Sequence, residues 1–169
     1  GGKASAGFAF AYTTNAGSVN ATVFSSHVDN ANNIEVVAKS INDSYMVAVG
    51  LGKASAVALA GSAAVLRNEQ LSMASVVKSQ LNAANDVDVA SDITSSSLMV
   101  AGGVANSENA LGAAVGTQIV SADGTTGGSV ALIDNSVVIA GGDINVDATS
   151  TFKLLNVAIG VAVSSGGVG

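Results

Sequence analysis

Nucleophilic catalysis in this chain would have to use His27, because it is the only histidine among the 169 residues. Ser25, Ser26 and Asp29 lie beside it, and serine, histidine and aspartate are the residue types of a hydrolase triad. The segment continues into the polar run 29–33, which is typical of a turn. No Gly-x-Ser-x-Gly motif between a strand and a helix presents a nucleophile. We therefore interpret His27 as part of a polar turn and predict no catalytic residue and no enzyme.

The paired carboxylates Asp86 and Asp88 are a second candidate for chemistry. They lie two residues apart in an expected strand, so both side chains point the same way. Acid pairs of this kind can cleave glycosidic bonds. The alternative function is therefore a β-helix carbohydrate-active enzyme, a lyase or glycosidase, that uses surface carboxylates. The equivalent positions exchange acids for amides, as on a solvated face: they are Asn33 and Glu35 in one repeat, and Asp143 and Asn145 in another.

The sequence predicts no metal site and no cofactor. Gly141-Gly142-Asp143 resembles the start of a calcium-binding nonapeptide, but it occurs once and without tandem copies. The chain has no cysteine, which excludes thiolate ligands, thiol nucleophiles and disulfides. Its glycine pairs lack the spacing to Gly-Lys-Ser/Thr that a phosphate-binding loop requires.

Charge and hydropathy restrict the partners. The net charge is −6 and no basic residue lies between Lys78 and Lys153, so nucleic acid would be repelled. Residues 47–66 form an apolar run with Lys53 as its one charge, as a membrane helix would. However, segments such as 8–12 and 57–60 alternate with a period of two rather than 3.6, which indicates strands. We expect no nucleic acid partner and no membrane span.

The elements that position these residues are strands that repeat along the chain. Two alternating strand motifs recur with the same offsets of 53 and 57 residues, which predicts a stacked β-solenoid. The first motif occupies 33–38, 86–90 and 143–148, and the second occupies 46–50, 99–103 and 156–160. Equivalent aliphatic side chains should form columns in the core. The predicted core ladder is Ile34, Val36, Val87, Val89, Ile144 and Val146.

The repeats give the expected organisation. The whole chain, 1–169, is interpreted as one solenoid segment of a longer protein. Strand signals of four to six residues, separated by polar clusters, predict coils of about 18 to 20 residues and a single rod of about eight or nine coils. The loose repeats are 1–43, 44–97, 98–153 and a truncated 154–169.

Two local patterns add to this organisation. The polar clusters 68–70 and 95–97 are expected to be turns between strands. The word Gly-Lys-Ala-Ser-Ala occurs at 2–6 and again at 52–56, which places residue 1 in the phase of Leu51.

Two surfaces are candidates for interaction. Phe8, Phe10 and Tyr12 point to one side of an expected strand whose other side carries alanines. If the alanines face the core, the aromatic residues form an exposed stripe that could bind sugar, lipid or another subunit. If the aromatic residues face inward, they are the bulkiest layer of the core, and we favour this interpretation.

The second candidate surface is the polar segment 123–128, which contains Asp123, Thr125 and Thr126. It is the longest polar insertion and would make the third repeat longer than the others. Loops of this kind commonly carry contacts with partners.

The units 46–52, 56–60 and 157–163 resemble the Ala/Val/Gly-rich repeats of large secreted bacterial surface proteins. These are the filamentous-haemagglutinin-like adhesins and autotransporter passengers, with a particular likeness to the large repetitive leukotoxins of anaerobic bacteria. The resemblance implies an all-β, right-handed parallel β-helix that is exported by type V secretion. It also implies a secreted or cell-surface location, a virulence role as adhesin or toxin, and a host-cell receptor or glycan as partner. No catalytic residues come with this family, and open coil ends favour end-to-end self-association.

Overall fold

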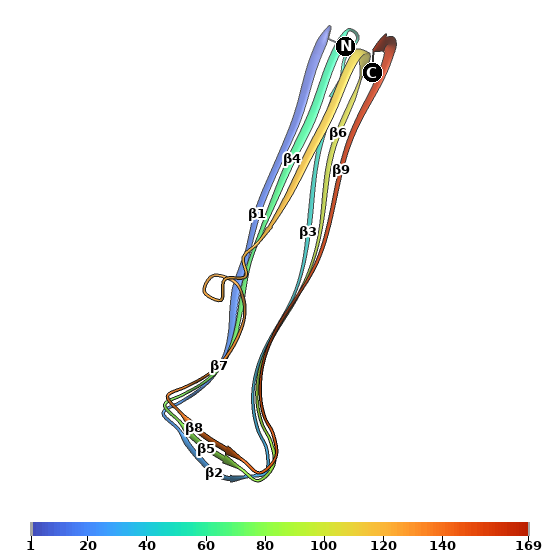
Figure 1. The fold of residues 1–169 in the computed structure, drawn as a ribbon. Helices are drawn as coiled ribbons and strands as arrows, with labels where there is room; N and C mark the ends of the chain where they lie inside the picture. Colours follow the sequence, from blue (N-terminus) through green and yellow to red (C-terminus); the bar gives the residue numbers. More distant parts are fainter. Residues whose placement is uncertain (1, 169) are drawn as a thin grey trace.

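The computed structural model describes residues 2–168, which form nine β-strands and no helix (Figure 1). The strands are β1 (Ala4–Phe24), β2 (His27–Ala31), β3 (Ile34–Lys53), β4 (Val57–Val77), β5 (Gln80–Ala83), β6 (Val87–Val120), β7 (Gly128–Asp134), β8 (Val137–Ala140) and β9 (Ile144–Val168). Every strand pair is parallel. The predicted all-β class with parallel strands is confirmed, and the arrangement is consistent with a β-helix.

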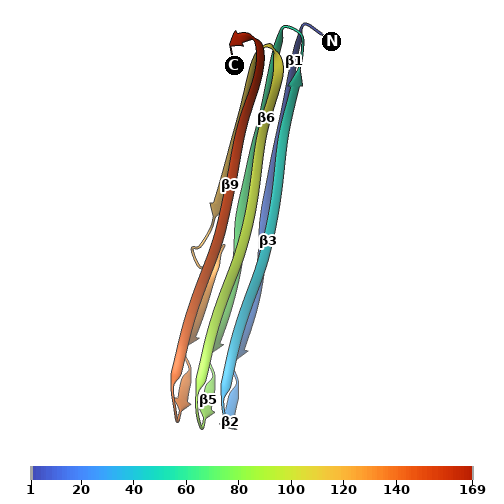
Figure 2. The ribbon, with the colours of Figure 1, turned by 90° about the vertical axis from the view of Figure 1, so that its right-hand side faces the viewer.

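The strands form two long faces and one short face. In one long face β4 lies between β1 and a third row made of the end of β6 followed by β7. In the other, β6 lies between β3 and β9. The short strands β2, β5 and β8 close one end, and β6 itself crosses from one face to the other at the opposite end, the tip (Figures 1 and 2).

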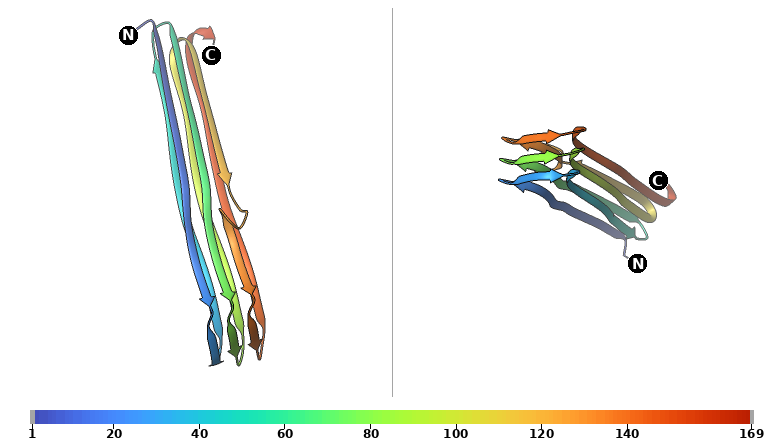
Figure 3. Two further views of the ribbon diagram at one scale, coloured as in Figure 1. Left: turned by 90° about the vertical axis from the view of Figure 1, so that its left-hand side faces the viewer. Right: turned by 90° about the horizontal axis from the view of Figure 1, so that it is seen from below.

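One winding uses a complete repeat. Ile34 pairs with Val87, and Val87 pairs with Ile144, which reproduces the offsets of 53 and 57 residues. The described chain therefore makes three windings, seen as three layers in Figure 3, and the prediction of eight or nine short coils is wrong. A 21-residue strand such as β1 spans about 70 Å, so the long axis lies along the strands rather than along the stack.

The predicted coil length was too short because polar clusters that were expected to be turns lie inside long strands. Residues 68–70 belong to β4 and residues 95–97 belong to β6, although both were expected to be turns. Asn68 is buried and donates from Nδ2 to Ser95 Oγ across the interior at 2.6 Å. A polar residue paired in this way does not need to reach solvent, so the strand continues through it.

The identical pentapeptides at 2–6 and 52–56 predicted the wrong register between the first two windings. Ala4 pairs with Val57, so the segment 2–6 does not lie opposite 52–56. The motif predicts an offset of 50 residues between the two windings, which differs by three residues from the observed offset of 53.

A repeated corner sets the turn into the short face. The residue at this corner has a left-handed backbone in each winding; the three are Ser25 (φ 48°), Lys78 (φ 51°) and Asn135 (φ 45°). A serine follows in every case. Ser79 accepts a hydrogen bond at Oγ from the amide of Ser26 at 3.1 Å and donates from Oγ to Val77 O at 2.9 Å. The amide of Ser79 in turn donates to Ser136 Oγ at 3.0 Å, so the serines form a ladder from winding to winding.

The closed end, here called the base, comprises residues 19–39, 72–92 and 129–149. Its interior is filled by aliphatic side chains from all three faces, and Leu81, Val76 and Val87 are fully buried. Such burial contributes about 1.5–3 kcal/mol per large side chain.

The open end, here called the blade, comprises 4–13, 45–53, 57–66, 98–106, 109–118 and 155–163. The two long faces approach closely here, and the buried residues toward its tip are the alanines Ala58, Ala60 and Ala105. A Cβ atom at Gly103 would collide with the backbone oxygen of Ala113 on the opposite face. Toward the tip the interior of the blade is therefore too thin for bulky side chains, whereas Met46, Leu66 and Met99 are buried nearer the base.

A polar layer separates base and blade. Gln70 Oε1 accepts from Ser40 Oγ at 3.3 Å, and Gln70 Nε2 donates to Asn15 Oδ1 at 3.0 Å. Asn15 Nδ2 then donates to Ser44 Oγ at 2.7 Å, which joins both long faces. These side chains satisfy one another, as buried polar groups must.

Candidate functional site

His27 and Asp29 lie in β2, so the interpretation of His27 as part of a polar turn is wrong; the corner itself lies just before it, at Ser25 and Ser26. His27 Nε2 lies 2.5 Å from Asp29 Oδ2, and both side chains are largely exposed. Ser26 Oγ donates to Phe24 O at 2.9 Å and holds the corner. Among the described hydrogen bonds none joins a serine hydroxyl to His27, so this geometry does not activate a nucleophile.

The carboxylates Asp86 and Asp88 contact the next winding. Asp86 Oδ1 accepts from the amide of Asp143 at 2.9 Å, and the amide of Asp86 donates to Asn33 Oδ1 at 3.4 Å. Asp88 Oδ1 accepts from Asn145 Nδ2 at 2.8 Å. These acids and amides form a corner ladder, which gives their exchange between repeats a structural explanation.

Within residues 2–168 the side chains that could bind metals are dispersed, and every secondary-structure element is a strand. No group of three or more His, Cys, Asp or Glu side chains gathers where it could hold a metal ion. None of the described segments is a helix long and apolar enough to cross a membrane.

The core ladder residues lie in two register columns. Ile34, Val87 and Ile144 form one column. Val87 is buried, Ile34 is half-buried, and Ile144 is exposed because β9 is the last strand of the described stack. The second column consists of Val36, Val89 and Val146. Val36 and Val89 are buried, and Val146, like Ile144, is exposed on β9.

The segment containing Asp123 is a self-contained loop. Residues 121–127 stand opposite Glu69 and Gln70 alone, because Asn68 pairs with Val120 and Leu71 with Gly128. Asp123 Oδ1 accepts from the amides of Thr125 at 2.9 Å and Thr126 at 2.7 Å, and Thr126 Oγ1 donates to Asp123 Oδ2 at 2.8 Å. These bonds, led by that from the Thr126 amide, hold the pKa of Asp123 well below its ordinary range.

The aromatic stripe is exposed, so the interpretation that it fills the core is wrong. Phe8, Phe10 and Tyr12 are 74%, 71% and 55% exposed. Ala9 and Ala11 pack inward against the core instead. The thin interior explains this orientation, because the faces are too close to hold phenyl rings.

The stripe is part of a wider apolar surface on the outside of β1, β4 and β6. Phe8 and Phe10 lie in register with Gly61 and Ala63, and these pair with Ala113 and Val115. Together they line a shallow groove of about 420 Å³. Further exposed apolar residues on this face of the blade are Val57, Leu59 and Leu111.

The opposite outer face of the blade is also apolar. The row Tyr45, Leu98 and Leu155 borders a shallow groove of about 390 Å³ that extends to Lys153. Beyond this row, large exposed apolar side chains continue to the tip: Val47, Val49, Leu51, Val104, Ile159, Val161 and Val163.

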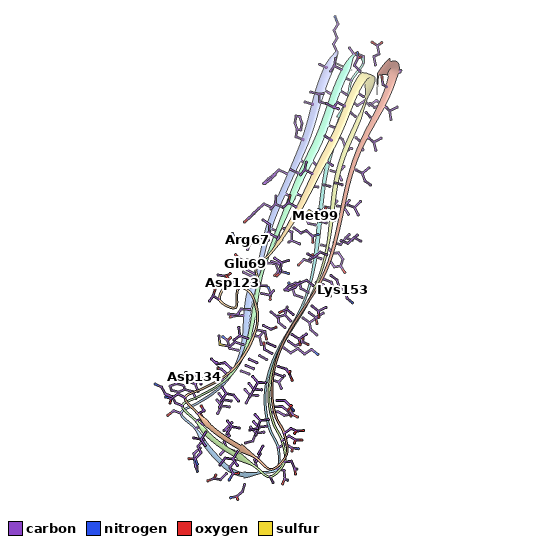
Figure 4. All side chains as sticks on the ribbon, viewed as in Figure 1. Arg67, Glu69, Met99, Asp123, Asp134 and Lys153 are labelled. Atoms are coloured by element: carbon purple, nitrogen blue, oxygen red, sulfur yellow. The ribbon has the colours of Figure 1, made fainter. Side chains whose placement is uncertain are left out.

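Charged residues are almost absent from the blade. Lys53 is the one charged residue within its six segments and lies at the tip. Lys3 and Glu108 lie just outside the segments 4–13 and 109–118. Eleven of the 12 acids lie toward the base, Glu108 being the exception. At the boundary, Arg67 lies on one outer face with Glu69 at 2.6 Å, and Lys153 lies on the other (Figure 4).

No protein-family model, curated protein or solved structure matches the chain. Functional inference therefore depends on the geometry of the blade, the base and the corner ladders.

Two features escaped sequence reasoning. The serine ladder was missed, although a serine recurs at the corner in all three repeats, at Ser26, Ser79 and Ser136. The apolar face around Tyr45 was missed because bulky apolar residues were assumed to point inward. The signal was present: between Tyr45 and Lys53 the alternate positions carry large and small residues, and the small set includes Gly50 and Gly52.

Proposed function

We propose that the chain is a structural repeat segment of a secreted bacterial adhesin or leukotoxin. It acts as a right-handed β-solenoid scaffold that presents a surface to host cells. The observation that carries the proposal is the continuous parallel register over three windings, with aligned columns and corner ladders. A repeat of this kind can be extended indefinitely, because each winding contacts only its neighbours.

The scaffold role follows from how the windings are joined. Residues of β6 bond to β3 and β4 on one side and to β9 on the other, so an added winding would repeat the same contacts. Open sheet edges at the first and third windings can pair with further windings or with another copy. End-to-end association is therefore part of the proposal.

The contact surface is the pair of apolar outer faces of the blade. Exposed aromatic and aliphatic side chains in such numbers are typical of interaction sites rather than of free protein surface. The host-cell partner is a surface component that an apolar, aromatic-bearing face can recognise.

The test is binding of the fluorescently labelled chain to leukocytes and epithelial cells. Phe10→Ser should reduce binding about fivefold or more, because it removes a ring at the centre of the stripe. Phe24→Ser is the matched control: Phe24 lies exposed on the same face of β1, but in the base, and its loss should leave binding unchanged. No cell binding by the native chain would overturn the proposal. Glycan cleavage lost in Asp88→Asn would favour the enzyme instead.

A further inference from the structure

We propose that the blade is a lipid-binding element that enters the hydrocarbon core of a bilayer. The proposal rests on the proposed function in one respect: it names lipid as the cell-surface component that the blade contacts. It is argued from the length of the charge-free band, from its two faces, from the position of the tyrosines and from the interior.

The charge-free band has the length that a bilayer requires. Each blade strand contributes nine or ten residues, for example 45–53 in β3, whose only charge is the terminal Lys53, and 57–66 in β4, which has none. At about 3.3 Å per residue these segments span about 30 Å, which matches a hydrocarbon core of about 30 Å. Charged side chains begin again at Asp43 on one face and Arg67 on the other, and Lys53 marks the tip.

Both outer faces of the blade are apolar, which distinguishes lipid from a second copy of the chain. A two-fold dimer buries the same patch on each partner and would leave the other face in water. Tyr45 and Val47 on one face are 79% and 67% exposed, and Phe8 and Phe10 on the other are exposed to a similar extent. A bilayer covers both faces at once.

The two tyrosines of the chain lie at the boundary of the band. Tyr12 is the last aromatic residue of the stripe before Arg67 and its row, and Tyr45 follows Asp43 on the other outer face. Tyrosine is enriched where hydrocarbon meets headgroups, because its ring is apolar and its hydroxyl is polar. Their placement on both faces, next to the Arg67 row on one and Asp43 on the other, marks the expected interface.

The interior of the blade is mainly apolar, and the buried hydroxyls of Ser5 and Ser62 have no hydrogen-bond partner among the described residues. Its buried residues are mainly Ala, Met and Leu, and parallel ladders pair the backbone of the central winding on both sides. Backbone groups on the open edges of β1, β3, β9 and the end of β6 must also be paired inside hydrocarbon. We therefore expect lipid-bound chains to associate edge to edge, with windings of neighbouring copies continuing the sheets.

The first experiment is co-flotation of the chain with phosphatidylcholine vesicles at high salt, where charge attraction is screened. The native chain should float with the vesicles. Val47→Glu should reduce the bound fraction about tenfold or more, because a carboxylate inside hydrocarbon is costly. Ile41→Glu is the matched control: Ile41 and Val47 are both 67% exposed on the outer face of β3, but Ile41 lies between Lys39 and Asp43.

The second experiment measures depth, using the absence of tryptophan from the chain. Single replacements Phe10→Trp and Phe24→Trp place the probe on the same face of β1, the first within the band and the second in the base. Phe10→Trp should shift its emission to the blue and be quenched by lipids brominated deep in the acyl chains. Phe24→Trp should show neither change.

The outcomes separate the explanations. Circular dichroism and thermal unfolding of each variant must match the native chain, which keeps misfolding from imitating lost binding. Equal flotation of Val47→Glu and Ile41→Glu would overturn the proposal, as would a native chain that stays lipid-free. Oligomers in lipid-free solution that Val47→Glu disperses would assign the blade to a second copy. A chain that binds cells but does not bind phosphatidylcholine vesicles would contradict lipid binding and leave the proposed function intact.

Discussion

Base and blade are built from the same three windings but with opposite distributions of side chains. In the base, large aliphatic residues such as Leu81, Val76 and Val87 fill the interior, and acids lie outside. In the blade, the interior narrows from methionine and leucine near the base to alanine and glycine toward the tip, and residues such as Phe10 and Tyr45 lie outside. Alternation specifies which residues share a side of a strand, but the space between the faces decides which side is the interior.

Because their interiors differ, base and blade are stabilised by different interactions. The base gains mainly from apolar surface removed from water, and its third face encloses the core. Toward its tip the blade buries little side-chain volume and depends on backbone ladders and close contact between its faces. Loss of volume should therefore damage the base, whereas added volume should damage the blade.

The largest expected effect is from Leu81→Ala in the base. Leu81 is fully buried, so the substitution leaves a cavity and should lower the free energy of unfolding by about 3–4 kcal/mol. Urea unfolding followed by circular dichroism measures the change. Leu132→Ala is the control, because Leu132 lies in β7 but is substantially exposed, and its loss should cost about 1 kcal/mol or less. Equal losses for the two variants would show that the base does not have the enclosed core described here.

The next effect is from Gly103→Ala in the blade. The added methyl group would meet the backbone oxygen of Ala113, so the faces must separate, at a cost of about 2–3 kcal/mol. Gly102→Ala is the neighbouring control, because a Cβ there lies 3.5 Å from Val49 Cγ2, an ordinary contact on the outer face. Its effect should stay within about 0.5 kcal/mol. Thermal unfolding of the two variants decides the point: if Gly103→Ala is as stable as Gly102→Ala, the blade is not tightly closed.

The parallel stack could be predicted from the sequence because each winding repeats its strand pattern. The columns that begin at Ile34 and Val36 depend only on the offsets between repeats, and these survive in the register of the structure. The insertion at Asp123 was also placed correctly, since seven residues there face two in β4.

The length of a winding and the orientation of the blade could not be predicted from local pattern. Asn68 and Ser95 resemble turn residues until their partners across the interior are known. The direction of Phe8 depends on how closely two distant strands approach, which is set by glycines such as Gly50 and Gly103 on the opposite face. Both properties depend on pairs of residues far apart in sequence.

The smallest expected effect lies at the boundary between base and blade, in the Asp123 loop. Asp123→Ala removes the acceptor for the amides of Thr125 and Thr126 and should speed their hydrogen exchange, whereas Asp123→Asn keeps an acceptor oxygen. The midpoint of thermal unfolding should stay within about 2 °C, because the loop packs into neither core. The pKa of this carboxyl is depressed, so its contribution is complete above the ordinary value of 3.8 and is lost as pH falls through the lower folded value. An NMR titration of the Thr126 amide should accordingly show its midpoint well below pH 3.8. A midpoint at the ordinary value would contradict the loop geometry, and a large fall in thermal stability would show that base and blade are coupled through it.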